Sequence, residues 1–263
     1  MKVIVSHDVD HLTWSEHYFR DLYIPKLWFR SVKLALQGVI SFKTAFSRMN
    51  FWSDNRMNRL AELMTFEKSK NICATYFFVM RPGLGVAYTH EEAIPMIKEV
   101  LKNGQHAGVH GMAYEDEGLM KEEFDNFRKI TGIENFGVRM HYLRNDEGTL
   151  KRLAHTGYRF DSTLYGNASP YKVGTMLEFP ISVMDVYCVR PTHKTLEEAK
   201  KYTMKELNQA EKSGQPYFVI NFHDMLFHPA YSLYKEWFEW VIDLCIQRGH
   251  NFTSFENEVN AWK

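Results

Sequence analysis

Short runs of β-branched and aromatic residues alternate with longer segments of helical periodicity along this chain. This alternation is typical of successive βα units, in which helices join the parallel strands of one sheet. Strands are expected at residues 2–6, 72–79, 105–110, 136–140, 158–161, 177–181, 217–222 and 252–255. Helices are expected at residues 55–69, 90–103, 117–131, 146–155, 196–213 and 233–248. Together they predict an α/β fold, a distorted (β/α)7-8 TIM-like barrel with its catalytic residues at the carboxyl ends of the strands.

Length and charge narrow the class of protein further. With 263 residues, of which 45% are apolar, the chain can bury one large core, and we predict a single domain over residues 1–263. Lys and Arg together number 32, as do Asp and Glu, so no basic field is available for binding nucleic acid. Three widely spaced cysteines predict reduced, buried thiols rather than disulfides or a zinc ribbon. They are Cys73, Cys188 and Cys245.

The N-terminal residues are informative about the subcellular location of the protein. The apolar run after Met1 is short and leads directly into the charged segment His7–Asp10. It is too short for a signal peptide, and no stretch of about 18 apolar residues follows it. We therefore expect a cytoplasmic protein.

Residues 12–50 form an insertion between the first strand and the next helix, and they are rich in aromatic residues. A helix that begins near Pro25 would be apolar apart from one narrow polar stripe. The stripe consists of Lys26, Arg30, Lys33 and Gln37. One interpretation is a cap helix packed on the mouth of the barrel. The other is a basic amphipathic helix, over residues 26–40, that contacts a membrane surface near a lipid-linked substrate.

The first strand ends with two carboxylates, Asp8 and Asp10. Residues two apart in a strand point to the same side, so these acids would repel each other unless a cation neutralises one of them. The other could then act as a base. A solvated loop or an Asx-type cap is the alternative for this pair alone. Imidazole commonly joins carboxylate in catalytic zinc sites, which keep one position open for water.

Two histidines, His106 and His110, have a spacing that would place both on one side of a helix. The preceding Asn103 and Gly104 are a helix C-terminal signal, however, so residues 105–110 are expected to form a strand. Residues four apart in a strand are separated by about 13 Å, and one metal ion cannot hold both. Only His110 would lie at the carboxyl end of the strand, and His106 is interpreted as an interior histidine.

Several segments, taken in order, resemble the motifs of the polysaccharide deacetylase family of carbohydrate esterases. The segments are Val3–Asp10, Ala74–Val79, Gly108–Gly111, Val138–Arg144, Tyr158–Ser162 and Val219–Asp224. The resemblance spans residues 3–224. It implies a distorted barrel and hydrolysis of an acetamido group on a sugar. It also implies one divalent metal ion as cofactor, namely zinc, with nickel, cobalt or manganese as alternatives.

Three departures from the family pattern make the expected metal site atypical. Val9 separates two aspartates that are adjacent in most members, and Tyr114 stands where a second histidine is expected. His141 stands where the family usually has proline. We therefore predict that Asp10, His110 and His141 hold the metal.

A competing interpretation gives the third ligand position to His106, or supposes that metal and activity have been lost. Against it, the segment Arg139–Arg144 is similar to branches of the family linked to surface-polysaccharide or O-antigen assembly.

The resemblance also implies the catalytic roles. Asp8 matches the general base, and Arg139 matches the residue that orients this base through a charged hydrogen bond. Asp161 and His223 match a pair in which the carboxylate keeps the imidazole protonated. The implied reaction is attack on the amide carbon by a water that Asp8 deprotonates, with His223 protonating the departing amine.

These features predict a metal-dependent carbohydrate N-deacetylase that acts on an amino sugar in a surface-polysaccharide or O-antigen precursor. We expect a nucleotide-linked or lipid-linked N-acetylated substrate, because a cytoplasmic enzyme meets biosynthetic intermediates rather than finished wall polymers. One alternative is a catalytically inactive sugar-binding protein with the same fold, in which the aromatic insertion and Tyr114 stack on a glycan. Another is a hydrolase of a different amide or a formamide.

Overall fold

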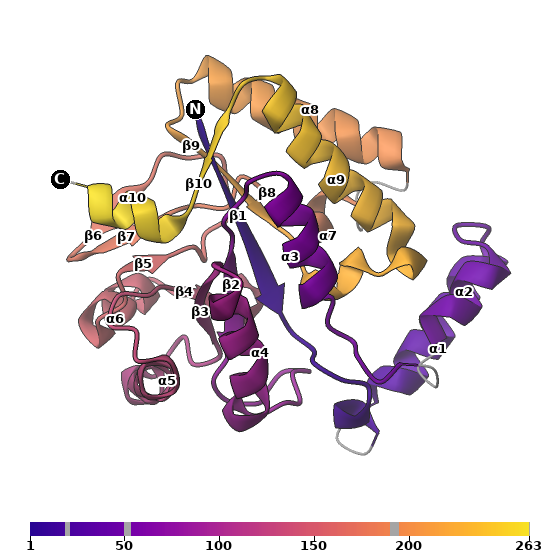
Figure 1. Cartoon of the computed structure of the whole chain (residues 1–263), viewed down its shortest axis with the longest axis horizontal. Coiled ribbons are helices and arrows are strands. Elements are labelled where there is room, and N and C mark those ends of the chain that lie inside the picture. Colours follow the sequence, from indigo (N-terminus) through magenta and orange to yellow (C-terminus); the bar gives the residue numbers. More distant parts are fainter. Residues whose placement is uncertain (19–21, 50–53, 190–194, 263) are drawn as a thin grey trace.

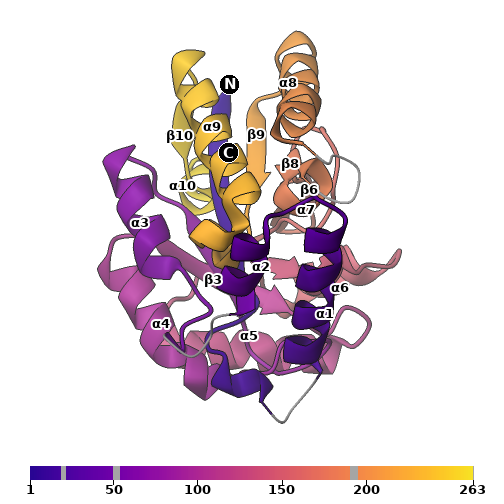
Figure 2. The ribbon, with the colours of Figure 1, turned by 90° about the vertical axis from the view of Figure 1, so that its right-hand side faces the viewer.

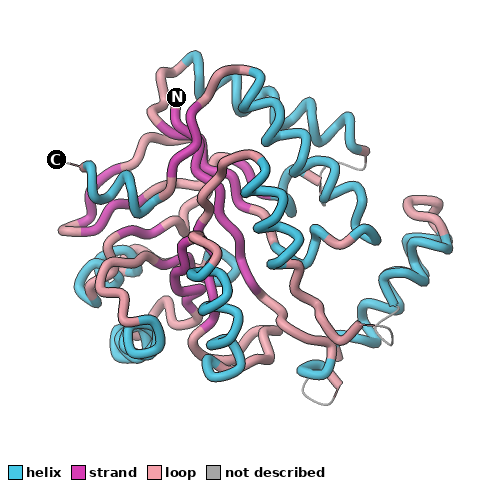
Figure 3. Tube along the Cα trace, viewed as in Figure 1, coloured by secondary structure: helices cyan, strands magenta, loops and turns pink. Residues whose placement is uncertain are grey.

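The strands of the computed structural model form one curled sheet (Figure 1, Figure 3). The structure describes residues 1–18, 22–49, 54–189 and 195–262. Within them the strands are β1 Lys2–Val9, β2 Thr75–Val79, β3 His106–Gly111, β4 Val138–Met140, β5 Phe160–Asp161, β6 Tyr171–Val173, β7 Met176–Glu178, β8 Val183–Met184, β9 Tyr217–Asn221 and β10 Asn251–Thr253. All eight predicted strands are present with shifted bounds, and the short strands β6 and β8 were not predicted.

The order of the sheet is β6-β7-β5-β4-β3-β2-β1-β9-β8, with β10 beside the first half of β1. Every pair is parallel except β6 with β7. An isolated bridge between Tyr165, which follows β5, and Ile181, which precedes β8, links two further segments. The sheet is thus a curled half-barrel, and the predicted α/β barrel-like fold is confirmed.

Helices cover the outside of this sheet (Figure 1, Figure 2). The main ones are α3 Leu60–Ser69, α4 His90–Lys102, α5 Glu117–Thr131, α6 Thr149–Thr156, α8 Leu196–Lys212 and α9 Ser232–Gln247. All six match predicted helices, and local signals fix their ends. Thr89 and Thr195 form capping boxes at the starts of α4 and α8, and Gly132 ends α5 with a φ of 70°. Shorter elements are α7 Asp185–Cys188, α10 Phe255–Ala261, η1 Ser15–His17, η2 His141–Leu143, η3 Asp224–Phe227 and η4 Pro229–Tyr231.

Alternating side chains of β1 divide the core into two clusters. Val3, Val5 and Val9 pack in the larger cluster with side chains of the surrounding helices. Ile4 packs in the smaller cluster, which is rich in phenylalanine and includes Phe255 from α10. Because side chains alternate along a strand, Asp8 projects to the same side as Ile4, into the barrel. This alternation is what brings charged residues to the inner surface at the carboxyl end of the sheet.

The insertion folds largely as a helical hairpin made of α1 Tyr23–Leu36 and α2 Phe42–Met49. The two helices contact each other, and α2 also contacts η4. In Figure 1 the hairpin lies at the right of the barrel, and Arg48 of α2 donates to the carbonyl oxygen of Ala230 in η4. Phe19, Arg20 and Asp21 of the insertion lie outside the described residues. Among the described helices, none combines the length and the apolar composition needed to cross a membrane.

Candidate active site

Arg139 stands at the centre of the carboxyl end of the barrel, on β4, and is fully buried. A guanidinium has five N–H groups, and burial makes each unpaired one costly. Here Nε donates to Ser162 O, Nη1 to Asp8 and Asn221, and Nη2 to the hydroxyls of Ser6 and Ser162. All five N–H groups of the guanidinium are therefore paired. The bond from Arg139 in turn holds the Asp8 carboxylate in position.

Asp8 is ionised in this setting. Burial by itself would raise the pKa of its carboxyl, but Arg139, followed by His110 and His223, lowers this pKa to about 2. Arg139 Nη1 lies 2.9 Å from Oδ1, and Asn221 Nδ2 donates to Oδ2 at 2.8 Å. The carboxylate thus has one defined orientation, as the sequence-based role of Arg139 requires. The contribution of Asn221 was not predicted.

Asp10, His110 and His141 meet at the carboxyl ends of β1, β3 and β4. His110 Nε2 lies 3.0 Å from His141 Nδ1 and 3.3 Å from Asp10 Oδ1. His141 Nδ1 lies 3.4 Å from the same oxygen. The structure therefore brings together the three residues that the sequence suggested as metal ligands, and their donor atoms are close enough to share one ion.

The hydrogen bonds of the two imidazoles indicate that this group is suited to hold a cation. His110 Nδ1 lies 3.0 Å from the carbonyl oxygen of Arg139, and His141 Nε2 lies 3.4 Å from that of Leu84. A carbonyl only accepts, so the ring proton of each imidazole can go to its carbonyl and leave Nε2 of His110 and Nδ1 of His141 to coordinate a cation. These two nitrogens lie 3.0 Å apart and face Asp10 Oδ1, a buried oxygen without a hydrogen-bond partner among the described residues. One carboxylate oxygen and two ring nitrogens that converge in this way fit a divalent cation.

The charge of Asp10 supports the same fit. Burial would raise the pKa of this carboxyl, but the neighbouring imidazoles of His110, His141 and His223 hold it well below its ordinary value. A carboxylate and two imidazoles form a donor set typical of catalytic zinc.

A strained turn follows His141 and directs its ring into the site. Tyr142 and Leu143 have φ values of 56° and 53°, a left-handed conformation that side chains with a Cβ rarely adopt. The ring of Tyr142 lies 4.0 Å from that of His141 and is 68% exposed. The turn thus places His141 inward and an aromatic ring outward at the same rim.

His106 and Tyr114, the other candidates for the second histidine position, lie elsewhere. His106 begins β3 at the opposite end from His110, and its Nε2 is 3.9 Å from Glu256. The ring of Tyr114 lies under the guanidinium of Arg144, 4.8 Å away. Neither belongs to the three-residue donor group.

The predicted pairing of Asp161 with His223 is wrong, because His223 is paired with Asp185. His223 Nδ1 lies 2.9 Å from Asp185 Oδ1, and its backbone N–H donates to Asp185 Oδ2 at 2.6 Å. Asp161 instead accepts a bond from Thr163 and lies beside Glu178. Burial raises the pKa of both acids, and Asp161 raises that of Glu178 further, so this pair retains a proton and is a poor counter-ion for an imidazole.

The imidazole of His223 is cationic. Burial would lower its pKa, but Asp185, Asp10 and Asp8 raise this pKa to about 10. Its Nε2 lies 3.7 Å from Asp10 Oδ2 and 3.9 Å from Asp8 Oδ2, so it faces the same space as the donor group. The only signal for Asp185 in the sequence is an acid directly after a short apolar run, and that run, β8, is two residues long.

A second group of buried donors, His11, Glu16 and His17, was also not predicted. His17 Nε2 lies 3.0 Å from His11 Nδ1 and 3.1 Å from Glu16 Oε1, and that oxygen accepts the backbone N–H of Leu12. One proton on His17 Nε2 can serve both neighbours, so hydrogen bonds alone account for this group.

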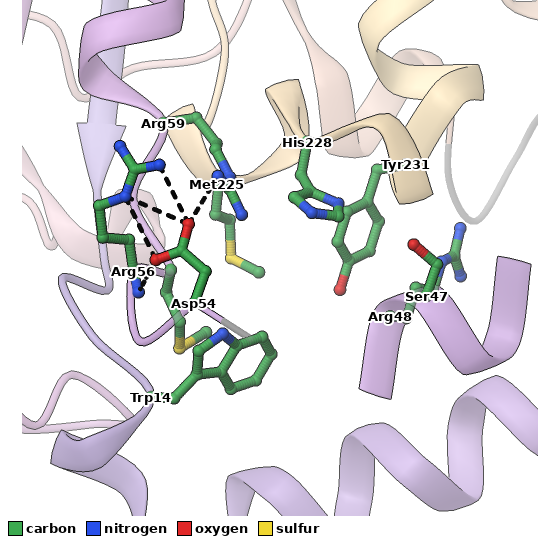
Figure 4. Close-up of a pocket in the computed structure, with 10 residues that line it drawn as sticks. Trp14, Ser47, Arg48, Asp54, Arg56, Arg59, Met225, His228 and Tyr231 are labelled. Atoms are coloured by element: carbon green, nitrogen blue, oxygen red, sulfur yellow. Dashed lines mark hydrogen bonds and ion pairs between the residues drawn. The ribbon is translucent and has the colours of Figure 1, made fainter. Parts of the chain in front are cut away.

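A cavity of about 260 Å³ is lined in part by Met225 of η3 and Tyr231 of η4 (Figure 4). Its walls include Trp14, Arg48, Asp54, Arg56, Arg59, Met225, His228 and Tyr231. Met225 comes two residues after His223, and Arg59 donates its backbone N–H to Asp224. Arg56 and Arg59 lie beside Asp54, and Arg48 lies on the other side of Tyr231 (Figure 4), so the lining has three guanidinium groups and one carboxylate, which suits an anionic ligand.

The parallel half-barrel and the charged group at its carboxyl end define a fold seen in polysaccharide deacetylases. No protein-family model and no curated protein matches the sequence. The chain is similar in structure to a candidate polysaccharide deacetylase from Mycobacterium smegmatis, with a TM-score of 0.66, 18% identity, and coverage of 99% of this chain and 89% of that one. A second such protein, from Pseudomonas aeruginosa PAO1, gives a TM-score of 0.63 at 14% identity, with coverage of 99% and 89%.

A CE4 family pseudoenzyme from Bacillus anthracis has the same fold, with a TM-score of 0.54, 11% identity, and coverage of 98% of this chain and 65% of that one. At these identities the likeness establishes the fold, which occurs in active and inactive proteins, and function has to be argued from the site.

Proposed function

We propose that this protein is a metal-dependent hydrolase that removes the N-acetyl group from an amino sugar in a surface-polysaccharide or O-antigen precursor. The observation that carries the proposal is the meeting, at one rim, of an ionised base, a cationic imidazole and three converging metal donors. Hydrolysis of an amide uses all three of these features, whereas binding a sugar without catalysis requires none of them.

Each residue has a defined task in the proposed reaction. A divalent ion held by Asp10, His110 and His141 would supply Lewis acidity and make a water molecule easier to deprotonate. Asp8, held by Arg139 and Asn221, accepts a proton from the attacking water. The water oxygen adds to the amide carbon and the C–N bond breaks. His223 gives its Nε2 proton to the departing amine, while Asp185 holds Nδ1, so the products are acetate and a free amino sugar.

The cavity supports a substrate that carries phosphate, as nucleotide-linked and lipid-linked sugars do. Among the lining residues, Arg48, Arg56 and Arg59 outnumber the one acid, Asp54, which pairs with Arg56 at 3.0 Å and lies 3.5 Å from Arg59. Glu62, outside the lining, also lies 3.3 Å from Arg59. Burial, with a contribution from Arg59, lowers the pKa of His228 to about 4, so this ring is neutral. Its Nδ1 accepts the N–H of Ala230, and its Nε2 therefore carries a proton and can donate to an anion.

Acetate release tests the function. N-acetylated sugar nucleotides, lipid-linked sugars and free N-acetyl sugars are assayed with zinc-loaded protein. Asp8→Asn should lower the rate by about 10²- to 10⁴-fold, the usual contribution of a positioned acid or base, at unchanged metal content. The matched control is Asp243→Asn, on the outside of α9. If Asp8→Asn released acetate at the wild-type rate, Asp8 would not be the base.

A second comparison tests the phosphate site. Arg56→Gln should raise KM for a phosphate-linked sugar and leave the reaction with a free sugar unchanged. An equal effect on both substrates would place the phosphate elsewhere. Release of formate rather than acetate from the corresponding N-formyl sugar would identify a deformylase with the same machinery.

A further inference from the structure

We propose that the hairpin of α1 and α2 is a docking surface for an anionic lipid bilayer. The hairpin stands beside the barrel (Figure 1, Figure 2), and of its residues Ser47 and Arg48 line the cavity described above, whereas the exposed side chains considered below do not. The proposal is therefore independent of the reaction argued above, and it is tested by binding alone.

The side chains of α1 form three lengthwise stripes. One is the buried stripe around Ala35. A second is apolar and exposed, with Trp28, Val32 and Leu36 at intervals of four residues and 46%, 43% and 73% exposed. Phe29 lies next to them and is 75% exposed. This helix therefore buries one apolar face and presents another to the surroundings.

The turn and α2 also expose large apolar side chains. Val39 in the turn is 49% exposed, and Phe42 and Phe46, one helical turn apart on α2, are 58% and 69% exposed. Single exposed apolar residues are ordinary on proteins, whereas a contiguous patch marks an interaction site. With those of α1, seven large apolar side chains are exposed on this one hairpin, and we refer to them as the apolar patch.

The third stripe of α1 is basic, and its charge indicates an anionic partner. Residues 23–49 contain five basic residues and no Asp or Glu, although the whole chain has 32 of each sign. Lys26, Arg30 and Lys33 follow one another along α1 beside the apolar stripe. Their aliphatic stems can lie along the apolar surface while the charges reach outward to anionic headgroups. A symmetric dimer through this patch would bring like charges together, which argues against a second copy as the partner.

The length of α1 defines how the hairpin would meet a bilayer. Its 14 residues span about 21 Å, less than the roughly 30 Å hydrocarbon core, so the helix lies in the interface. Trp28 and Phe29 would then insert at the boundary between headgroups and acyl chains, and the barrel would remain in water.

Co-sedimentation with vesicles measures this docking. Wild-type protein should bind vesicles made of phosphatidylcholine and phosphatidylglycerol in equal amounts, bind phosphatidylcholine vesicles much less, and be released by high salt. Lys26→Gln/Arg30→Gln/Lys33→Gln should weaken binding roughly a hundredfold, since each cation near the surface contributes about fivefold. The matched control, Lys98→Gln/Lys102→Gln/Lys129→Gln, removes the same charge from exposed positions on α4 and α5 and should bind as wild type does.

The apolar contribution is tested separately. Phe29→Ser/Phe46→Ser should lower the partition coefficient by at least about tenfold. Circular dichroism checks that each variant remains folded. Wild-type protein that fails to bind anionic vesicles would overturn the proposal. Self-association in solution, measured by light scattering and abolished by Phe29→Ser/Phe46→Ser, would assign the patch to a second copy instead.

Discussion

The two histidines of β3 are four residues apart, and their side chains lie in different environments at the two ends of the strand. His110, at the carboxyl end, is buried against Asp10 and His141, with its Nε2 facing them. His106, at the amino end, is partly exposed and lies 3.9 Å from Glu256. The strand supplies the same residue type to both ends of the barrel, so the difference lies in what the neighbouring elements bring to each end.

At the amino end, polar contacts join segments that are far apart in the sequence. Lys2 Nζ lies 2.7 Å from Glu258, which also accepts a bond from Tyr217. Thr75 donates to Glu256 across the start of β2. At the carboxyl end, the contacts set the pKa values of Asp8 and His223, which lie beside the predicted metal ligands. We therefore expect substitutions at the amino end to change stability, and those at the carboxyl end to change metal binding and turnover.

The largest effect is expected from His141→Ala. Loss of one donor from a group of three should reduce bound zinc from about one ion per chain to near zero. Acetate release should fall by at least about a hundredfold, since even the loss of an outer hydrogen-bond partner costs 10- to 100-fold. Inductively coupled plasma mass spectrometry measures the metal. His155→Ala, at an exposed position on α6, is the control, and full zinc occupancy in His141→Ala would remove this residue from the ligand set.

At the amino end, Glu256 should make the stability of the fold depend on pH. Burial raises the pKa of this carboxyl from 4.5 to about 7. The folded protein therefore binds the proton more tightly than the unfolded chain. The resulting stabilisation is complete below pH 4.5 and is lost as the pH rises through about 7, a change of at most about 3 kcal/mol.

Urea unfolding at several pH values, compared between the wild type and Glu256→Gln, checks this effect. The difference in free energy of unfolding between the two proteins should shift across this interval and stay constant above it. A difference that is independent of pH would show that Glu256 titrates normally in the folded protein.

At the carboxyl end, Asp185→Asn should give an intermediate effect. Without the carboxylate at Nδ1, the pKa of His223 falls, and less of the cationic acid is present at a given pH. We expect a 10- to 100-fold loss of turnover and an alkaline limb of the pH–rate profile that moves to lower pH. Asp161→Asn should leave the position of that limb unchanged. The reverse result would restore Asp161 as the functional partner of His223.

The contrast between the two ends shows what sequence can predict. The helices were found because their caps and periodicity are local, as at Thr89 and Thr195. The inward direction of Asp8 and the separation of His106 from His110 follow from strand geometry alone. The grouping of Asp10, His110 and His141 was suggested by family resemblance and by where their strands end.

Other features depended on contacts that no local pattern reveals. Asp185 follows a strand of two residues, too short to show periodicity, and its pairing with His223 depends on β8 lying beside β9. The left-handed turn at Tyr142 occurs without the glycine that usually indicates one. The sequence also left undecided whether the hairpin is exposed. An apolar stripe predicts that a helix face is buried, but it does not identify what covers that face.

The smallest effect is expected from His106→Ala, the substitution that tests the rival ligand assignment. His106 is about one-third exposed, and its contact with Glu256 is longer than a hydrogen bond, so the free energy of unfolding should change by less than about 1 kcal/mol. Zinc content and acetate release should match the wild type, because the ring lies at the other end of β3 from Asp10. Loss of zinc from His106→Ala with the fold intact would contradict the separation of the two ends, since it would require a residue of the amino end to act at the carboxyl end.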